Sequence, residues 1–287
     1  MNILVTGGNG QLGSTLKDIV KSNPHNNNYI FTDFNELDIT DFNNVRKYIC
    51  DNDIKMVINC AAYTNVDGAE NNPIITTMLN TNAVTNLSQI MRDVDGTLIH
   101  ISTDYVFGSG YNTPIQEDDE MYPCNVYGIT KSLGEIFIRK NSCKYLIFRT
   151  SWLYSEYGKN FVKTMLELTE NKPELKVVFD QVGSPTYAYD LGKMIFDIIE
   201  KELYEGNEGV YHYSNEGVCT WYDFAKLINK YSGHRCNIKP CRTDELSYQA
   251  KRPSYSVLDK TKIKNTFGIS IPYWTKSLRT CLKNIKE

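Results

Sequence analysis

The chain has 287 residues, which is enough to bury a substantial core in one large or two smaller domains. Charged residues make up 23% of the sequence and the net charge is only −3, so we expect no nucleic-acid partner and no attraction to an anionic membrane. No apolar run approaches the length of a membrane span, and the first residues lack the pattern of a signal peptide, which predicts a cytoplasmic protein. The 8 cysteines form no Cys-x-x-Cys pair and the 4 histidines show no metal-ligand spacing, which predicts reduced thiols and no metal site.

The first 150 residues alternate short apolar runs with helical segments. Strands are predicted at 3–5, 29–32, 56–60, 97–102 and 146–150, and the first helix is predicted to begin near Gln11. These apolar runs are continuous rather than alternating, which is typical of strands covered on both faces. Strands separated by helices predict an α/β fold of the Rossmann type, with a doubly wound parallel sheet.

The pattern loosens after about residue 150. Helices are predicted at 160–170, 188–201 and 274–283, a helix capped by Thr220 follows a late strand at 209–213, and 181–186 is predicted to be a loop. We therefore predict a dinucleotide-binding Rossmann domain over residues 1–153, with later segments near 188–213 packing back onto it. Residues 154–287 are predicted to form a smaller α/β region that mainly binds substrate.

A glycine-rich turn joins the first strand to the first helix, with glycines at Gly7, Gly10 and Gly13. Glycine permits a turn that no β-carbon allows and lets backbone N–H groups approach a pyrophosphate, while the helix N-terminus adds a positive dipole end. A turn without a ligand is the alternative, but the strand–turn–helix context favours a dinucleotide site.

Asp33 ends the second strand, where an acid can bond an adenosine ribose. Taken alone, Asp33 could equally be a helix cap or a loop charge. An acid at this place favours NADH, but a nearby donor could still accept a 2′-phosphate. The sequence therefore predicts NADPH or NADH without choosing between them.

Tyr127 and Lys131 lie one helical turn apart, and Thr103 immediately follows a predicted strand. The same Tyr-x-x-x-Lys spacing occurs at Tyr189/Lys193 and Tyr222/Lys226, but neither pair follows a strand-end hydroxyl at a suitable distance. A phenol beside an ammonium can act as a proton shuttle, because the positive charge lowers the pKa of the phenol from its usual value of about 10. A hydroxyl at Thr103 can hold a carbonyl in line for reduction. Each residue also has a structural alternative: Thr103 could be a turn cap, Tyr127 a buried aromatic and Lys131 a solvated charge on a helix. Their position in the predicted fold favours the catalytic interpretation.

These motifs resemble those of the extended short-chain dehydrogenase/reductase family, which shares Thr-Gly-x-x-Gly-x-x-Gly and Tyr-x-x-x-Lys. More narrowly, the chain is similar to the dTDP-4-dehydrorhamnose reductases within that family. The segments that carry the narrower resemblance are 59–70, 101–107, 125–131, 148–154, 160–165 and 180–186, together with Arg252-Pro253. They span almost the whole chain.

The resemblance implies NAD(P)H-dependent reduction of the C4 ketone of dTDP-4-dehydro-β-L-rhamnose, the last step of dTDP-rhamnose biosynthesis. It also implies that Tyr127 donates the proton, that Lys131 bonds the nicotinamide ribose and that Thr103 positions the carbonyl. Further cofactor contacts are implied for Gln11, Leu12, Asp33, Asp38, Ile39, Ala61, Ala62 and Tyr63. Contacts to the sugar nucleotide are implied for Val66, Asp104, Tyr105 and Trp152, although Trp152 could instead be a core aromatic.

Some members of the family bind Mg²⁺ at a dimer contact through glutamates. The positions aligned to two of these glutamates hold Thr15 and Tyr189 here. Mg²⁺ is therefore doubtful, and so is that mode of dimerisation, while a homodimer of another kind stays possible.

Three other functions have to be weighed against the reductase. Nucleotide-sugar dehydratases resemble one another in a Thr-Asp-Glu run, but Thr103-Asp104 is followed here by Tyr105, so the second acid is missing. Another nucleotide-sugar epimerase or reductase stays open, and so does dTDP against UDP as the nucleotide. A non-catalytic regulatory subunit, similar to the β-subunit of methionine adenosyltransferase, is the remaining alternative.

Overall fold

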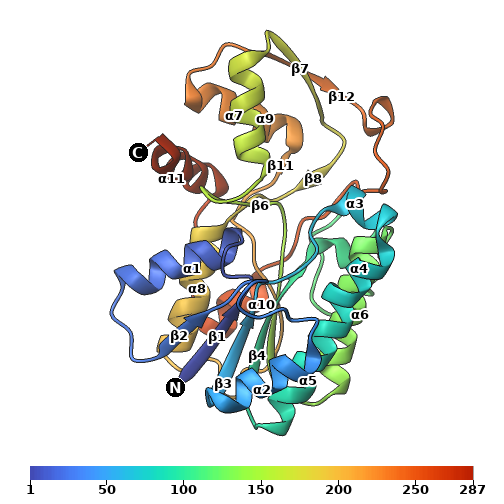
Figure 1. Ribbon diagram of the computed structural model, residues 1–287. Coiled ribbons are helices and arrows are strands. Elements are labelled where there is room, and N and C mark those ends of the chain that lie inside the picture. The colour runs from blue at the N-terminus through green and yellow to red at the C-terminus, as the bar shows by residue number, and fades with distance from the viewer. Residues whose placement is uncertain (287) are drawn as a thin grey trace.

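The computed structural model describes residues 1–286, and its centre is a sheet of six parallel strands in the order β10-β5-β4-β3-β1-β2 (Figure 1). The strands are β1 (Asn2–Thr6), β2 (Asn28–Phe31), β3 (Ile54–Asn59), β4 (Thr97–Thr103), β5 (Lys144–Thr150) and β10 (Gly209–His212). The chain passes from β1 to β2 on one side and then returns to β3 on the other. The gap between β1 and β3 is therefore the topological switch point, beyond which ligands bind in such sheets.

Helices cover both faces of the sheet, which confirms the predicted doubly wound Rossmann fold. One face carries α1 (Gln11–Ser22), α8 (Ala188–Glu200) and α10 (Thr261–Phe267), and the other carries α2 (Phe42–Asp51), α5 (Ala83–Asp93) and α6 (Val126–Lys140). Successive side chains of β1 alternate between these two layers: Ile3 and Val5 belong to the first core and Leu4 to the second. Both faces are apolar, which explains the continuous hydrophobic run at the sequence level.

Shorter helices surround the carboxyl ends of the strands. They are α3 (Val66–Asn71), α4 (Pro73–Thr77), the π-helix η1 (Met78–Asn82) and the 3₁₀ helix η2 (Asp104–Val106). The π-helix links α4 to α5 without a break. Extra residues of this kind inside a helix occur frequently at functional sites.

A C-terminal lobe packs beyond the carboxyl ends of the sheet strands and has a core of its own (Figure 1). Its helices are α7 (Phe161–Asn171), α9 (Trp221–Ser232), α11 (Trp274–Lys286) and the 3₁₀ helix η3 (Thr243–Glu245). Its strand pairs are β7 (Glu174–Val178) with β12 (Asn237–Cys241), β6 (Leu153–Tyr154) with β9 (Thr186–Tyr187), and β8 (Val182–Gly183) with β11 (Cys219–Thr220). The predicted cap at Thr220 is confirmed, because its hydroxyl accepts the Asp223 amide in a capping box. The predicted loop at 181–186 contains β8 and the first residue of β9.

The chain runs back and forth between the sheet and the C-terminal lobe. After α7 and β7 it returns to the sheet as α8 and β10, leaves again as α9 and β12, and returns once more as α10. The assignment of residues 1–153 to cofactor and 154–287 to substrate is a functional division, and it stays a prediction.

Within residues 1–286, no helix is both long enough and apolar enough to cross a lipid bilayer.

Candidate active site

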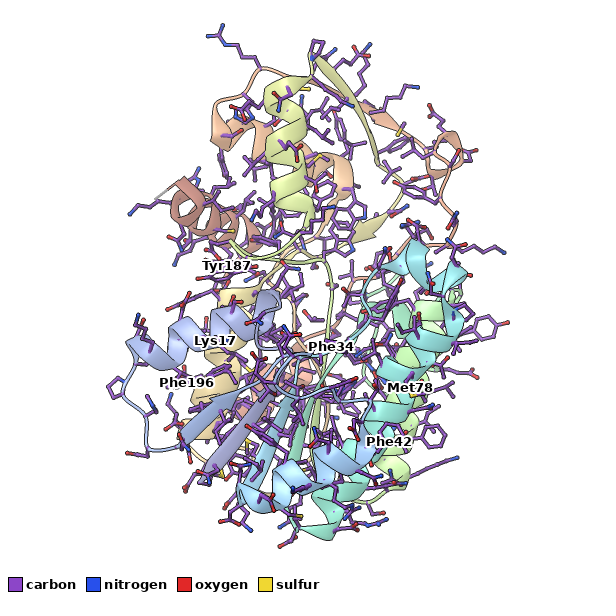
Figure 2. The ribbon with its side chains drawn as sticks, viewed as in Figure 1. Lys17, Phe34, Phe42, Met78, Tyr187 and Phe196 are labelled. Atoms are coloured by element: carbon purple, nitrogen blue, oxygen red, sulfur yellow. The ribbon has the colours of Figure 1, made fainter. Side chains whose placement is uncertain are left out.

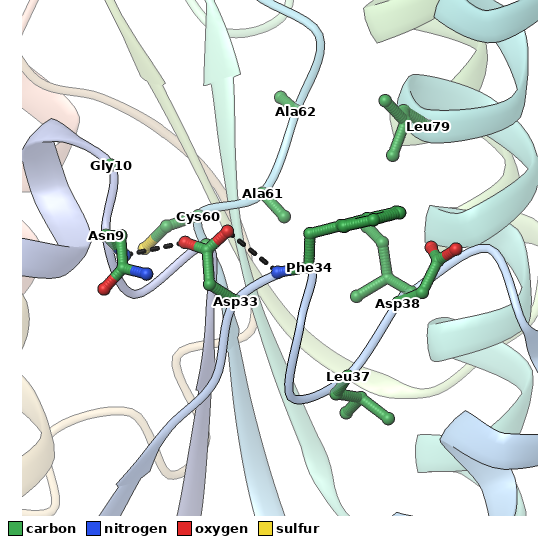
Figure 3. A pocket seen from close by; sticks show the side chains of 12 residues that line it. Asn9, Gly10, Asp33, Phe34, Leu37, Asp38, Cys60, Ala61, Ala62 and Leu79 are labelled. Atoms are coloured by element: carbon green, nitrogen blue, oxygen red, sulfur yellow. Dashed lines mark hydrogen bonds between the residues drawn. The ribbon is translucent and has the colours of Figure 1, made fainter. Parts of the chain in front are cut away.

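Two adjoining cavities lie at the carboxyl ends of the sheet strands. The inner cavity, of about 600 Å³, extends from the glycine turn to Tyr127 and on to the C-terminal lobe. The outer cavity, of about 410 Å³, extends from the same turn to the loop after β2 (Figure 3). The two share Gly7, Gly10, Cys60 and Ala62 as lining residues, so they form one bent depression over the switch point.

The structure brings nearly all the predicted site residues to these cavities. The inner cavity is lined by Gly7, Gly10, Gln11, Leu12, Gly13, Ala62, Val66, Thr103, Asp104, Tyr105, Tyr127, Lys131 and Trp152. The outer cavity adds Asp33, Asp38, Ile39 and Ala61. Tyr63 lines neither cavity; its backbone N–H and carbonyl are instead held by the Asn80 side chain. The pairs Tyr189/Lys193 and Tyr222/Lys226 also lie outside both cavities.

The glycine turn brings two loops of backbone into contact at the switch point. Gly7 has a φ of +64°, and a β-carbon there would lie 2.7 Å from the amide nitrogen of Ala61. No side chain larger than hydrogen fits this position. The N-terminus of α1, at Gly10, has no capping side chain within residues 1–286, so the first N–H groups of the helix are available to bind an anion. The turn therefore fits the pyrophosphate of a dinucleotide.

Asp33 and Phe34 form the wall of the outer cavity that faces solvent. The Asp33 carboxylate accepts the amide of Asn9 at 2.7 Å and that of Phe34 at 2.8 Å, as the dashed lines of Figure 3 show. Phe34 is 70% exposed, although it is a large apolar side chain (Figure 2). An exposed ring beside an anchored acid fits an adenine base that stacks on the ring and a ribose that bonds the acid.

Thr103 and Tyr127 are brought together by tight packing of α6 against η2. Asn125 caps α6 by accepting the Gly128 amide at 2.8 Å, and a β-carbon on Gly128 would lie 2.2 Å from the carbonyl oxygen of Tyr105. This close approach seats the first turn of α6 on the end of β4. The Thr103 hydroxyl accepts the Tyr105 amide at 3.1 Å and donates to Asp104 Oδ1 at 3.1 Å.

The Tyr127 phenol is protonated at neutral pH in this environment. Burial raises the pKa of Tyr127 to about 12, and the charge of Asp104 acts in the same direction, while the Thr103 hydroxyl lowers the pKa. The sequence predicts a pKa lowered by the ammonium of Lys131, whereas the structure gives a raised pKa, because a buried phenolate loses its hydration. The group is consequently a proton donor in its resting form.

Lys131 is 2% exposed and stands beneath the inner cavity. Its Nζ donates to the Ile101 carbonyl at 2.6 Å and lies 3.2 Å from Nε2 of His100. Burial lowers the pKa of Lys131 to about 8, while the negative charge of Glu135 acts to raise it. The amine thus stays mostly charged at pH 7 but titrates within the range in which enzymes are assayed.

Asp104 is 2% exposed, and its Oδ2 has no hydrogen-bond partner in the described part of the chain. Burial raises the pKa of Asp104 to about 7, although hydroxyls of Ser256 and Thr103 act to lower it. A buried oxygen without a partner costs free energy unless a ligand supplies one. Asp104 therefore fits a group that bonds a substrate hydroxyl.

Trp152 lies where the sheet meets the C-terminal lobe. It has a φ of +50°, and its ring stacks on that of Trp221 with centroids 3.6 Å apart and an angle of 11° between the planes. A β-carbon on Gly183 would lie 2.7 Å from the Trp152 ring. The unusual backbone conformation of Trp152 thus places a flat aromatic surface on the inner cavity. This placement fits a residue that contacts a ligand better than one that only fills the core.

The whole chain matches the model of one protein family. That family is described as the RmlD substrate binding domain, and the match covers residues 1–287. The chain belongs to this family. A dTDP-4-dehydrorhamnose reductase from Aggregatibacter actinomycetemcomitans is 37% identical over 96% of this chain and 97% of its own length. The resemblance predicted from the sequence motifs is confirmed.

Solved structures of related proteins agree with this assignment to the RmlD family. A dTDP-4-dehydrorhamnose reductase from Clostridium acetobutylicum has a TM-score of 0.95 to this chain at 40% identity, with complete coverage of both chains. One from Bacillus anthracis, solved in complex with NADP, has a TM-score of 0.93 at 37% identity and covers 99% of both chains.

Sequence reasoning missed several residues that line the inner cavity of this RmlD-family chain. Trp221 was predicted only to lie at the start of a helix. Asn160 was predicted to begin a helix and belonged to a segment that carries the family resemblance, while Gly158 and Lys159 had no predicted role. Asn80 is also new: its amide holds the backbone of Tyr63 and donates to the Thr130 hydroxyl at 3.2 Å. Nothing in the sequence marks the π-helix that aims Asn80, whereas a tryptophan at a helix start could have been flagged.

Within residues 1–286, no group of three or more His, Cys, Asp or Glu side chains is placed to hold a metal ion. Thr15 donates its hydroxyl to the Gln11 carbonyl at 2.8 Å, and Tyr189 stacks on Tyr187. These two positions offer no carboxylate for Mg²⁺. The expectation of no metal stays a prediction.

Proposed function

We propose that this protein reduces the C4 ketone of dTDP-4-dehydro-β-L-rhamnose to dTDP-L-rhamnose, the last step of dTDP-rhamnose biosynthesis, with NADPH or NADH as cofactor. The observation that carries the proposal is the placement of Thr103, Tyr127 and Lys131 on one cavity with the dinucleotide turn. The end-to-end similarity to dTDP-4-dehydrorhamnose reductases supports the same activity.

The roles of the three residues follow from their surroundings. A reduced nicotinamide bound in the inner cavity supplies the hydride. Tyr127 holds a proton on its phenol at neutral pH and is proposed to give it to the oxygen formed from the ketone. Thr103 is proposed to orient that oxygen by a hydrogen bond, which requires its hydroxyl to leave Asp104. Lys131 is proposed to bond the nicotinamide ribose and to favour release of the Tyr127 proton by its charge.

The outer cavity is proposed to take the adenosine end of the cofactor. Asp33 is suited to a free ribose and hence to NADH. Lys17 donates to the Asn9 side chain at 2.9 Å, and Asn9 is itself bonded to Asp33, so a cation stands close by for the 2′-phosphate of NADPH. The other proposed cofactor contacts in the outer cavity are Asp38, Ile39, Ala61 and Ala62. Gln11 and Leu12 on the inner cavity, and Tyr63, which lines neither cavity, are proposed to contact the cofactor as well.

The sugar nucleotide is proposed to bind between the sheet and the C-terminal lobe. Its proposed contacts are Val66, Asp104, Tyr105 and Trp152. Trp221 is a further proposed contact, because it lines the same cavity and stacks on Trp152. We propose on this basis that residues 1–153 mainly bind cofactor and residues 154–287 mainly bind substrate.

A coupled turnover assay tests the proposal. Purified protein is mixed with dTDP-4-dehydrorhamnose and with its UDP counterpart, each with NADPH or NADH, and the loss of reduced-nicotinamide absorbance is followed. The proposal expects turnover with the dTDP sugar and a product with the stereochemistry of L-rhamnose. No turnover together with tight binding to a partner protein would instead support the regulatory-subunit alternative.

We also propose a cytoplasmic homodimer that binds no nucleic acid. Exposed apolar side chains support self-association: Ile74 and Ile75 on α4 are 83% and 51% exposed. Met78 on η1, which is labelled in Figure 2, is 36% exposed. Sedimentation of the wild type and of an Ile74→Lys, Ile75→Lys variant measures the mass. A wild-type protein that sediments as a monomer at assay concentration would contradict the dimer.

A further inference from the structure

A row of polar side chains crosses the middle of the sheet below the inner cavity. Thr6 ends β1, Asn59 ends β3 and His100 lies on β4, and the strand register pairs Thr6 with Asn59 and Asn59 with His100. Paired positions on neighbouring strands send their side chains to the same face, so the three stand in line. Lys131, on α6 above that face, completes the row.

The four side chains form one continuous chain of contacts. Thr6 Oγ1 donates to Asn59 Oδ1 at 2.7 Å, Asn59 Nδ2 lies 3.2 Å from His100 Nδ1, and His100 Nε2 lies 3.2 Å from Lys131 Nζ. None of the four is more than 2% exposed. Burying polar groups where apolar ones would pack costs free energy, and only a fully connected network avoids most of that cost.

The directions of these hydrogen bonds determine which proton His100 carries. Since Asn59 Oδ1 accepts from Thr6, its amide nitrogen donates to His100 Nδ1, and the proton of the neutral imidazole is then on Nε2. An Nε2–H group faces Lys131 favourably only if the lysine is a neutral amine that accepts. This arrangement therefore suits the uncharged form of Lys131.

The charged form of Lys131 requires every bond of the row to point the other way. An ammonium must donate to a bare Nε2, so the imidazole proton moves to Nδ1 and the Asn59 amide turns to present its oxygen. Its nitrogen then donates to the Thr6 hydroxyl. The imidazole stays neutral in both arrangements, in keeping with the pKa of His100, which burial and the Lys131 charge hold well below its usual value.

We propose that His100, backed by Asn59 and Thr6, is a positioning residue that sets the charge state of Lys131 through the direction of this buried row. The proposal rests on the role proposed above for Lys131 at the cofactor ribose. His100 touches neither cavity and acts only through Lys131. Because Thr6 directly precedes Gly7, the row also joins the dinucleotide turn to the catalytic helix.

Other ionisable groups around Lys131 do not replace this effect. Glu135, one turn further along α6, is paired with Arg149 at 2.8 Å and with the Ser102 hydroxyl. Burial raises the pKa of the Cys60 thiol to about 12, so this group stays neutral. Tyr127, one turn earlier on α6, is likewise neutral, and Asp104 of η2 acts on Tyr127. His100 is the nearest group whose hydrogen bonding can change with the charge of Lys131.

The test measures the pH dependence of NADH binding by nicotinamide fluorescence, and of kcat/KM, from pH 6 to 10. NADH is chosen because the extra phosphate of NADPH titrates near pH 6. His100→Leu removes an acceptor that stabilises the Lys131 ammonium, and this lowers the pKa of Lys131. The pH at which NADH affinity falls should therefore decrease by about one unit. His100→Gln keeps an acceptor near the Nε2 position and should restore the wild-type curve.

Asn59→Asp should move the curve the opposite way. A carboxylate can only accept, so it holds the imidazole proton on Nδ1 and leaves Nε2 bare for the ammonium. The proposal is overturned if a folded His100→Leu variant titrates like the wild type, or if the Leu and Gln variants shift alike. If the Leu variant does not fold, an unshifted Asn59→Asp curve overturns it instead. A wild type that binds neither NADH nor NADPH would contradict the proposed function itself, which separates the two failures.

Discussion

Replacing Asp104 by asparagine should stabilise the folded protein, and by an amount that grows with pH. The carboxyl is buried, its Oδ2 has no hydrogen-bond partner among residues 1–286, and its pKa is raised to about 7 from an ordinary 3.8. An acid whose pKa is higher in the folded state binds its proton more tightly there than in the unfolded chain. Between pH 4 and 7 the folded chain therefore holds about one proton more, and stability falls as the pH rises through that window.

The magnitude follows from the size of the shift. A rise of about three pH units at 1.36 kcal/mol per unit gives an upper limit of about 4 kcal/mol, fully present above pH 7. Only the part of the window above pH 5.5 is sampled between pH 5.5 and 8, which leaves about 2 kcal/mol. The stability gain of Asp104→Asn over the wild type should increase by that amount across the interval.

Urea unfolding of the protein without ligands measures this difference at the two pH values. Asp244→Asn is the control, because it makes the same chemical change at an exposed position in the C-terminal lobe. A gain for Asp104→Asn that is the same at pH 5.5 and at pH 8 would refute the reasoning, because an ordinary carboxyl pKa gives no such dependence.

Four further substitutions test the site and the core. Tyr127→Phe should lower kcat by roughly a hundredfold with cofactor affinity nearly unchanged, as measured by steady-state kinetics and fluorescence titration; near wild-type turnover would exclude the proton-donor role. Trp221→Ala should raise KM for the sugar nucleotide about tenfold with kcat little changed, since it removes the ring behind Trp152. Asp33→Asn should reduce the kcat/KM ratio of NADH to NADPH by about tenfold, and an unchanged ratio would remove its ribose role. Arg149→Leu should cost about 3–5 kcal/mol in urea unfolding, because it leaves the buried Glu135 carboxylate unpaired; a loss below 1 kcal/mol would contradict this.

The sheet was predictable because its strands are buried on both faces. Runs such as 3–5 and 56–60 have no polar positions that face solvent. Each run is also followed or preceded by a glycine turn or a helical segment, which marks its limits. The pair β7 and β12 was not predicted for the opposite reason. β12 reads Asn-Ile-Lys-Pro-Cys, in which polar residues alternate with apolar ones and Pro240 lacks an N–H, a pattern that a sequence alone does not separate from a loop.

The site was predictable where chemistry requires a particular residue type. Gly7 has no substitute at its backbone conformation, and the Tyr127/Lys131 spacing follows from the helical turn. Asn59 and His100 gave no such signal, because a polar residue in an apolar strand can equally face a strand end or solvent. Only the register of β3 against β4 shows that the two side chains meet.

The repeated crossing of the chain between the sheet and the C-terminal lobe has a consequence for synthesis on the ribosome. The first core of the sheet takes Leu191, Ile195 and Tyr211 from the middle of the chain and Phe267 and Ile271 from near its end. That face of the sheet cannot be closed until these late residues have left the exit tunnel. The nascent chain must therefore keep an apolar sheet face shielded for most of translation, and a fragment that stops after β5 would expose it permanently.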